Sequence, residues 1–222
     1  MTRAYFNHKA AIWDETISEK DTAKLMGMVK RLNIAPGSAV LDVGTGTGVL
    51  LPFLLGEVGE DGSVIALDYA GEMLRKARAK GFDGNVDYLC ADVTNIPLRE
   101  GIFDIAVCYS SFPHFQDKLV ALIEINRVLK LAGRLVICHT AARHVINGIH
   151  RQIPALTNDT IPGKEEMCSM LAAAGFTDVE LDDDGKSYFC CARKLGLEKL
   201  EVLGLKLKAD VQSFYRVSKR SY

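Results

Sequence analysis

A glycine-rich segment, Asp42-Val43-Gly44-Thr45-Gly46-Thr47-Gly48, constrains the fold of this chain more than any other sequence feature. It follows the apolar run at residues 39–43, which is typical of a parallel strand buried on both faces, and it precedes a second apolar run at residues 49–54. Glycines let a turn adopt dihedral angles that other residues avoid, and the first turn of the next helix offers unpaired N–H groups. The segment therefore predicts a ligand-binding loop between a strand and a helix.

Strand-like and helix-like segments alternate along most of the remaining chain. Further strands are predicted at residues 63–68, 86–90, 103–108 and 134–138, and helices at 5–16, 21–32, 71–80, 118–129 and 163–174. Two last strand-like runs, at 179–181 and 188–192, flank a polar turn and predict an antiparallel hairpin. The alternation is typical of βαβ units. The sequence thus predicts an α/β fold: a doubly wound, mostly parallel seven-stranded sheet with a C-terminal antiparallel hairpin and helices on both faces.

Composition and charge narrow the class of protein. The chain has 222 residues with 27 basic and 28 acidic side chains, and its formal net charge of -1 disfavours nucleic acid and anionic membranes as partners. It contains neither a run of about 18 apolar residues, which a membrane span requires, nor an N-terminal apolar signal segment, so we expect a cytoplasmic protein. Six cysteines without a CxxC motif predict reduced thiols in the core.

The spacing of the glycines distinguishes between nucleotide ligands. A dinucleotide-binding loop has glycines at its first, third and sixth positions, but here the sixth position is Val49 and the third glycine is Gly48. The resulting Asp-x-Gly-x-Gly-x-Gly pattern resembles the first motif of class I S-adenosylmethionine-dependent methyltransferases. Asp68 and Asp92 end the next two predicted strands, where this family binds the ribose and the adenine of its cofactor.

The resemblance extends over residues 5–194. Residues 103–115 resemble the fourth strand of the family and the loop after it, and residues 128–135 resemble the turn into the fifth strand, although Leu131-Ala132 replaces the expected Pro-Gly. The segment with Tyr5, Phe6 and Trp13 resembles the one that folds over the cofactor in ubiquinone-biosynthesis-type small-molecule methyltransferases.

The resemblance implies a domain division and a cofactor. We divide the chain into an N-terminal helical cap segment (1–35), a Rossmann-like methyltransferase core (36–194) and an appended amphipathic helical tail (195–222), all within one domain. For the tail, packing on its own domain and a homodimer contact both stay open. The implied cofactor is S-adenosylmethionine, with Asp42, Gly44, Thr45, Gly46, Gly48, Asp68, Tyr69, Asp92, Val93, Tyr109 and Ser110 as its binding residues.

The implied activity is in-line transfer of a methyl group to a small-molecule acceptor. Such catalysis consists mainly of alignment and exclusion of water, but an acceptor with a high pKa needs a base. His114 is the candidate base, because its loop should border the methyl group. Two alternatives stay open: a module that binds S-adenosylmethionine or a nucleotide without turnover, and a NAD-dependent oxidoreductase, which Val49 and the hairpin disfavour.

Residues 139–151, after the fifth strand, contain three of the five histidines and two arginines. They form either a pocket wall, in which Arg143 or Arg151 binds an anionic acceptor group, or a solvated helix. A metal site of His144, His150 and Asp159 is disfavoured, because a six-residue spacing does not place two imidazoles on one helix face. The sequence therefore predicts no metal, and it predicts substrate-binding residues at Tyr5, Trp13, His114, Arg143, His144 and Arg151.

Overall fold

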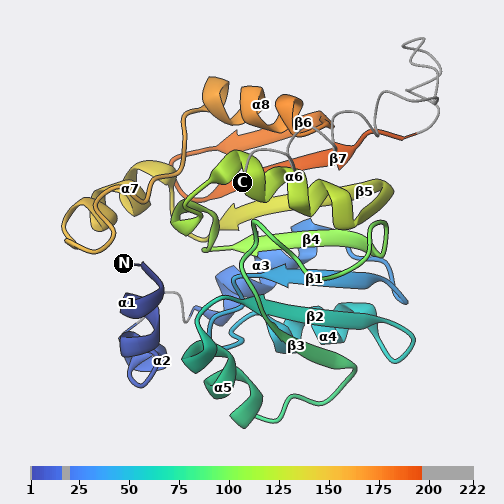
Figure 1. The fold of residues 1–222 in the computed structure, drawn as a ribbon, viewed down its shortest axis with the longest axis horizontal. Coiled ribbons are helices and arrows are strands. Elements are labelled where there is room, and N and C mark those ends of the chain that lie inside the picture. The colour runs from blue at the N-terminus through green and yellow to red at the C-terminus, as the bar shows by residue number, and fades with distance from the viewer. Residues whose placement is uncertain (1, 17–20, 197–222) are drawn as a thin grey trace.

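The computed structural model describes residues 2–16 and 21–196, which contain a single sheet of seven strands (Figure 1). The strands are β1 (Ala39–Val43), β2 (Ser63–Asp68), β3 (Val86–Cys90), β4 (Phe103–Tyr109), β5 (Leu129–His139), β6 (Phe176–Asp183) and β7 (Tyr188–Lys194). Their order across the sheet is β3-β2-β1-β4-β5-β7-β6. Strands β1 to β5 pair in parallel, and β7 lies antiparallel to both β5 and β6. The predicted fold class is confirmed.

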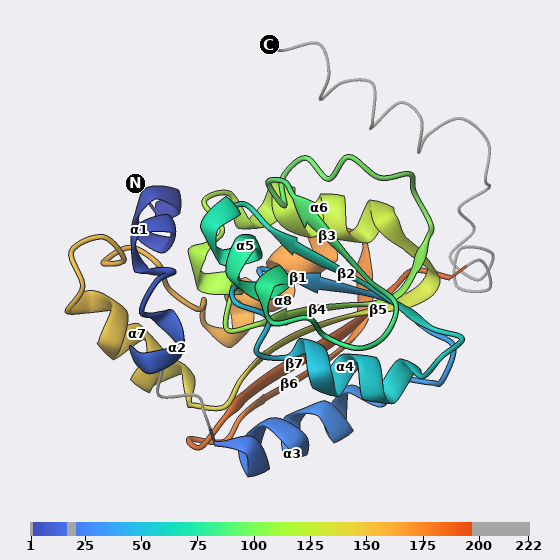
Figure 2. The same ribbon diagram turned by 90° about the horizontal axis from the view of Figure 1, so that it is seen from below.

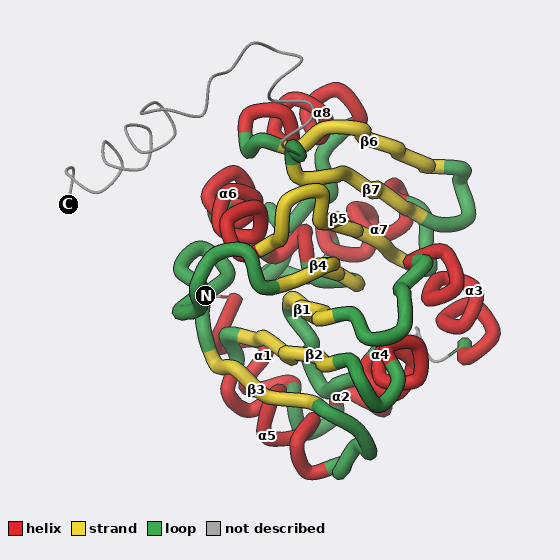
Figure 3. Tube along the Cα trace, turned by 90° about the vertical axis from the view of Figure 1, so that its right-hand side faces the viewer, coloured by secondary structure: helices red, strands yellow, loops and turns green. Residues whose placement is uncertain are grey.

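Helices cover both faces of this sheet. They are α1 (Thr2–Lys9), α2 (Trp13–Thr16), α3 (Thr22–Leu32), α4 (Leu51–Val58), α5 (Gly71–Ala79), α6 (Lys118–Val128), α7 (Arg143–Arg151) and α8 (Lys164–Ala173), with a short 3-10 helix at Phe112–His114. Neighbouring residues of a strand point to opposite faces, so Leu41 joins an apolar cluster with α6 and α8, whereas Val40 joins one with α3 and α4. Figure 3 shows α6 on one side of the sheet and α3 and α4 on the other.

The strand order reverses between β1 and β4, and this reversal locates the ligand crevice. In doubly wound sheets, ligands bind at the carboxyl ends of the strands beside such a switch point. The N-terminal helices α1 and α2 and the helix α7 lie at that end of the sheet (Figures 1 and 2). Helix α3, by contrast, packs on the sheet face through Leu25, Met28, Val29 and Leu32.

Several element boundaries differ from the sequence predictions. The helix predicted at 5–16 is split into α1 and α2, and the break brings Trp13 edge-on to Phe6, with their ring centroids 5.5 Å apart. Strand β5 begins at Leu129 rather than at residue 134, because the turn expected around Leu131-Ala132 lies within the strand. At this turn Ala132 has a φ of 59°. The pairing register between β4 and β5 shifts between Phe103 and Ile105. Strand β6 is likewise longer than the predicted 179–181.

The remaining sequence predictions are confirmed only in part. Helix α3 has Asp21 as its N-cap, with the carboxylate accepting from the N–H groups of Ala23 and Lys24. All six cysteines are free thiols, and Cys108, Cys138 and Cys190 are buried, whereas Cys90 is exposed and is therefore not a core thiol. Within residues 2–16 and 21–196, no helix has the length and apolar character that crossing a bilayer would require. The predicted tail helix and its homodimer contact lie outside the described residues.

Candidate active site

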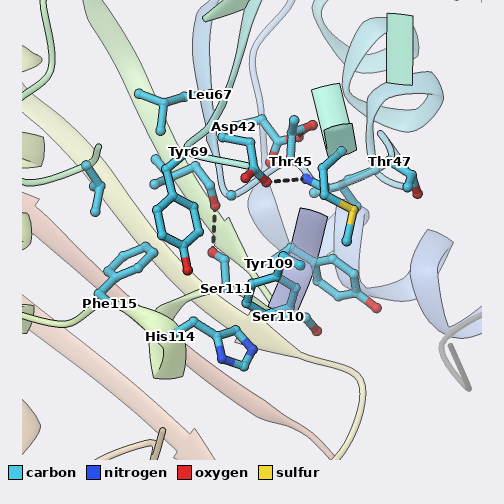
Figure 4. A pocket seen from close by; sticks show the side chains of 18 of the residues that line it. Asp42, Thr45, Thr47, Leu67, Tyr69, Tyr109, Ser110, Ser111, His114 and Phe115 are labelled. Atoms are coloured by element: carbon cyan, nitrogen blue, oxygen red, sulfur yellow. Dashed lines mark hydrogen bonds between the residues drawn. The ribbon is translucent and has the colours of Figure 1, made fainter. Parts of the chain in front are cut away.

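A pocket lies at the carboxyl ends of β1, β2 and β4 (Figure 4). It contains about 1040 Å³ of empty space, which includes its open mouth. Its lining comes from the glycine loop (42–47), the strand ends at 67–69 and 91–93, the segments 109–111 and 114–116 after β4, and from Phe6, Trp13, Val49, Leu50 and Met73. Most of the predicted cofactor-binding residues therefore meet in one place.

The glycines of the loop serve different purposes. Gly44 has a φ of 74°, and a Cβ atom there would lie 2.4 Å from the Cβ atom of Ser111, so a side chain would clash with the β4 loop. A Cβ atom on Gly46 would meet nothing within 4 Å, which leaves this part of the loop open to a ligand. Gly48 lies outside the pocket lining, because its position is packed against the ring of Phe82. The cofactor contact predicted for Gly48 stays a prediction.

Asp68, at the end of β2, ties the glycine loop to the sheet. Its Oδ2 atom accepts from the Gly46 N–H at 2.8 Å, and its Oδ1 atom accepts from the Ala70 N–H at 2.8 Å. Burial raises the pKa of Asp68 above its ordinary value, and these two backbone hydrogen bonds oppose that shift. Each carboxylate oxygen has a second lone pair, so Asp68 can still accept from a ligand hydroxyl.

Asp42 is more deeply buried, with 2% of its surface exposed. The Thr45 hydroxyl donates to its Oδ2 atom at 2.6 Å. Burial raises the pKa of Asp42 to about 7, and the nearby Asp68 carboxylate adds to the shift. The charge of the loop therefore changes near neutral pH.

Asp92, just after the end of β3, also lines the pocket and is exposed. Its Oδ1 atom accepts from the backbone N–H of Thr94 at 2.9 Å and from its hydroxyl at 2.8 Å, which fixes the direction of the carboxylate. Val93 beside it is buried and supplies apolar surface. The end of β3 thus presents one carboxylate and one apolar side chain to the pocket.

Ser111 fastens the loop after β4 to the glycine loop. Its hydroxyl donates to the Val43 carbonyl at 2.6 Å (Figure 4), and the preceding residue, Ser110, has a φ of 52°. The Ser110 N–H donates to the Cys138 carbonyl at 3.0 Å. Sequence reasoning missed Ser111, although the close approach of Gly44 depends on it.

His114 enters the pocket from the 3-10 helix after β4. Its Nδ1 atom lies 2.8 Å from the Oδ2 atom of Asp159, and its side chain is 13% exposed. Burial lowers the pKa of His114 below its ordinary value, while the hydrogen bond with Asp159 opposes that shift. The imidazole is therefore neutral at neutral pH and able to accept a proton.

The N-terminal helices close one side of the pocket. Phe6 and Trp13 line it, whereas Tyr5 packs on Phe6 outside the lining. The Thr47 hydroxyl donates to Oδ1 of Asp14 at 2.5 Å, and Lys80 lies 3.0 Å from the Oδ2 atom of Asp14. Helix α2 is thereby attached to the glycine loop itself.

Arg143, His144 and Arg151, which the sequence predicts to bind substrate, lie outside the pocket lining. The Arg143 Nε–H donates to Oδ2 of Asp183 at 2.9 Å, and the Arg151 Nε–H donates to the Asn147 carbonyl at 3.2 Å. His144 is exposed. No cluster of three or more histidine, cysteine, aspartate or glutamate side chains among the described residues is arranged to hold a metal ion.

Known proteins provide an independent comparison. The family described as "Methyltransferase domain" matches residues 41–137. The "Ubiquinone/menaquinone biosynthesis C-methyltransferase UbiE" of Teredinibacter turnerae is 38% identical over 108 residues, which are 47% of this chain and 43% of that protein. The protein of the same description from Paraburkholderia xenovorans is 35% identical over 114 residues, 50% of this chain and 47% of that protein. The chain thus spans less than half the length of these curated relatives.

Solved structures match nearly the whole described fold. A "SAM dependent methyltransferase from Aquifex aeolicus" is 27% identical, with a TM-score of 0.69 over 85% of this chain and 98% of that one. The chain is thus similar to class I S-adenosylmethionine-dependent methyltransferases, in sequence over residues 41–137 and in fold over most of its length. A methyltransferase solved in complex with the Haloferax volcanii Trm112 activator has a TM-score of 0.74 over 86% of this chain and 97% of its own, but at 19% identity it shows the fold alone.

The residues of this pocket suit S-adenosylmethionine, the cofactor that the similar methyltransferases are named for. Its ribose hydroxyls and adenine amino group are hydrogen-bond donors, and Asp68 and Asp92 are acceptors at neighbouring strand ends. Apolar side chains of Leu67, Met73 and Val93 lie beside these carboxylates and can cover an adenine ring. The pocket extends beyond the cofactor-binding loop to His114, which leaves space for an acceptor.

Proposed function

We propose that this methyltransferase transfers the methyl group of S-adenosylmethionine to a small-molecule acceptor, with His114 as general base. The observation that carries the proposal is a single pocket that combines the glycine loop, the carboxylates of Asp68 and Asp92, and a neutral imidazole. When bound, the cofactor supplies an electrophilic methyl group on a sulfonium centre. The protein must bind it, align an acceptor behind the methyl group and keep water out.

Two groups of residues divide this work. Asp68, Asp92 and the backbone of Gly46 bind the nucleoside part of the cofactor. On the acceptor side, Phe6, Trp13 and Phe115 line the pocket with apolar rings and exclude water. His114 lies on the same side and removes a proton from the acceptor atom that receives the methyl group.

The chemistry of this side favours an acceptor with apolar or aromatic character and an ionisable hydroxyl, amine or carbon acid. Relatives named as ubiquinone/menaquinone biosynthesis C-methyltransferases are consistent with a small acceptor. The predicted contact of Arg143, His144 or Arg151 with a substrate stays a prediction, since these side chains lie outside the pocket lining.

Titration calorimetry tests the cofactor, and a methyl-transfer screen tests the reaction. S-adenosylmethionine and S-adenosylhomocysteine should bind, whereas NAD should bind at least tenfold more weakly. Labelled S-adenosylmethionine incubated with pools of small phenols, quinols, amines and acids should yield a methylated product. Tight NAD binding would contradict the cofactor assignment. Cofactor binding without transfer to any pool would favour a binding module instead.

A further inference from the structure

Asp159 lies outside the pocket lining but contacts His114, although sequence reasoning considered it only as a disfavoured metal ligand. We propose that Asp159 is a positioning residue that holds His114 with its proton on Nδ1, so that the unprotonated Nε2 atom receives the proton of the acceptor. The inference rests on the proposed function and adds a residue from a loop 45 positions further along the chain.

The geometry of the pair determines which nitrogen carries the proton. The Nδ1 atom of His114 and the Oδ2 atom of Asp159 are 2.8 Å apart, and the two side chains are only 13% and 10% exposed. A carboxylate accepts hydrogen bonds and does not donate them, so Nδ1 must be the donor. In a neutral imidazole the other nitrogen is then an acceptor. Because both groups are shielded from water, the alternative tautomer would leave two polar atoms unpaired.

Helix α7 fixes the loop that carries Asp159. The Nδ1–H of His150 donates to the Asp159 carbonyl at 2.6 Å. Asn147, one helical turn earlier, donates to the Ile161 carbonyl at 3.0 Å and accepts from the Ile161 N–H at 2.8 Å. His150 and Asn147 are buried and share one helix face. The loop is therefore held at Asp159 itself and at Ile161, and the Asp159 carboxylate points at His114 before any ligand binds.

The ring of His114 is also held by packing. The Phe6 ring meets it edge-on with 4.8 Å between centroids, and the His150 ring lies tilted at 4.8 Å. His139 on β5 and Lys118 on α6 are the other titratable groups that influence it. Against this background of neutral or positive groups, the carboxylate of Asp159 is the group that favours a positive charge on His114.

In the proposed reaction, the proton of the acceptor moves to His114 as the methyl group is transferred. The acceptor atom loses its proton to Nε2 of His114 and uses the released electron pair to bond the methyl carbon. The electron pair of the broken carbon–sulfur bond remains on sulfur. His114 becomes an imidazolium, whose Nδ1–H stays bonded to the Asp159 carboxylate, and it returns the proton to solvent after the product leaves.

The first test needs neither an acceptor nor a cofactor. Long-range ¹H–¹⁵N NMR spectra of the full-length protein report which nitrogen of each histidine is protonated, and His114→Gln assigns the signal. We expect His114 to be protonated on Nδ1 and bare on Nε2 at pH 7.5. A bare Nδ1 would overturn the proposal, whatever the cofactor experiments show. The tautomer itself is read from the wild-type protein, and the variant serves only to assign the signal.

The second test compares Asp159→Asn with Asn158→Ala, a change at the exposed neighbouring position of the same loop. Asp159→Asn should lower kcat by about 100-fold or more, the scale of general base catalysis, and leave the Kd of S-adenosylhomocysteine within about twofold. Loss of the carboxylate should also move the acidic limb of the kcat profile to lower pH, because Asp159 raises the pKa of His114. The control should retain wild-type kcat. An unchanged pH profile, or equal losses of kcat and cofactor affinity, would show a merely structural role.

Discussion

Asp42→Asn should remove a pH-dependent loss of stability from the protein without its cofactor. Burial raises the pKa of Asp42 from 3.8 to about 7, so the folded state disfavours the ionised carboxylate. The sign follows from proton binding: between these two pKa values the folded protein holds a proton that the unfolded chain has released, so stability falls as pH rises. At 1.36 kcal/mol per pKa unit the full cost is about 4 kcal/mol, reached well above pH 7.

The measurement is the free energy of unfolding by urea at pH 5 and pH 8. Between these values the wild-type protein should lose about 2 to 3 kcal/mol more than Asp42→Asn, because part of the full cost is already present at pH 5, where the unfolded chain has released the proton. The asparagine carbonyl can still accept from the Thr45 hydroxyl, so the local hydrogen bond is retained. Asp83→Asn, at an exposed position, is the control and should follow the wild-type protein. Parallel curves for wild type and Asp42→Asn would refute the reasoning.

Three further changes test the pocket. Asp68→Ala should weaken S-adenosylhomocysteine binding by about 1 to 3 kcal/mol in calorimetry. The ribose hydroxyls would lose their proposed acceptor, and the N–H groups of Gly46 and Ala70 would lose theirs. An unchanged Kd would place the ribose contact elsewhere. Gly44→Ala should weaken the same binding more than tenfold, since its Cβ atom would clash with Ser111 at 2.4 Å, and near-normal affinity would mean that the loop adjusts freely. Arg143→Met should raise the acceptor KM without changing cofactor affinity if Arg143 orients the acceptor; identical kinetics would leave it a surface residue paired with Asp183.

The cofactor side of the site was predictable because its signals are local. Asp68 and Asp92 come at the ends of apolar strand runs, and the carboxyl ends of parallel strands meet at one edge of the sheet. The glycine loop directly follows β1, so it was expected at the same edge of the sheet. The prediction needed no knowledge of how distant segments pack.

The other side of the pocket was predictable only in part: Trp13 and His114, both named from the sequence, line it, but the contacts that hold it in place join distant segments. Ser111 bonds to Val43 across 68 residues of sequence, and His114 to Asp159 across 45. The sequence instead predicted substrate binding by Arg143 and its neighbours, because a basic segment that follows β5 was expected to border the cleft. In the structure the buried face of α7 carries Asn147 and His150, whereas Arg143 pairs with Asp183.

The distribution of the pocket residues along the chain has a consequence for how such proteins diverge. The family match, residues 41–137, contains the glycine loop, Asp68, Asp92 and His114. Phe6, Trp13 and Asp159, which shape or support the acceptor side, lie outside it. Under the proposed function, mutation of the segments before β1 and after β5 would alter which molecule is methylated while the residues proposed to bind the cofactor are kept. Selection would then act on substrate choice without rebuilding the glycine loop.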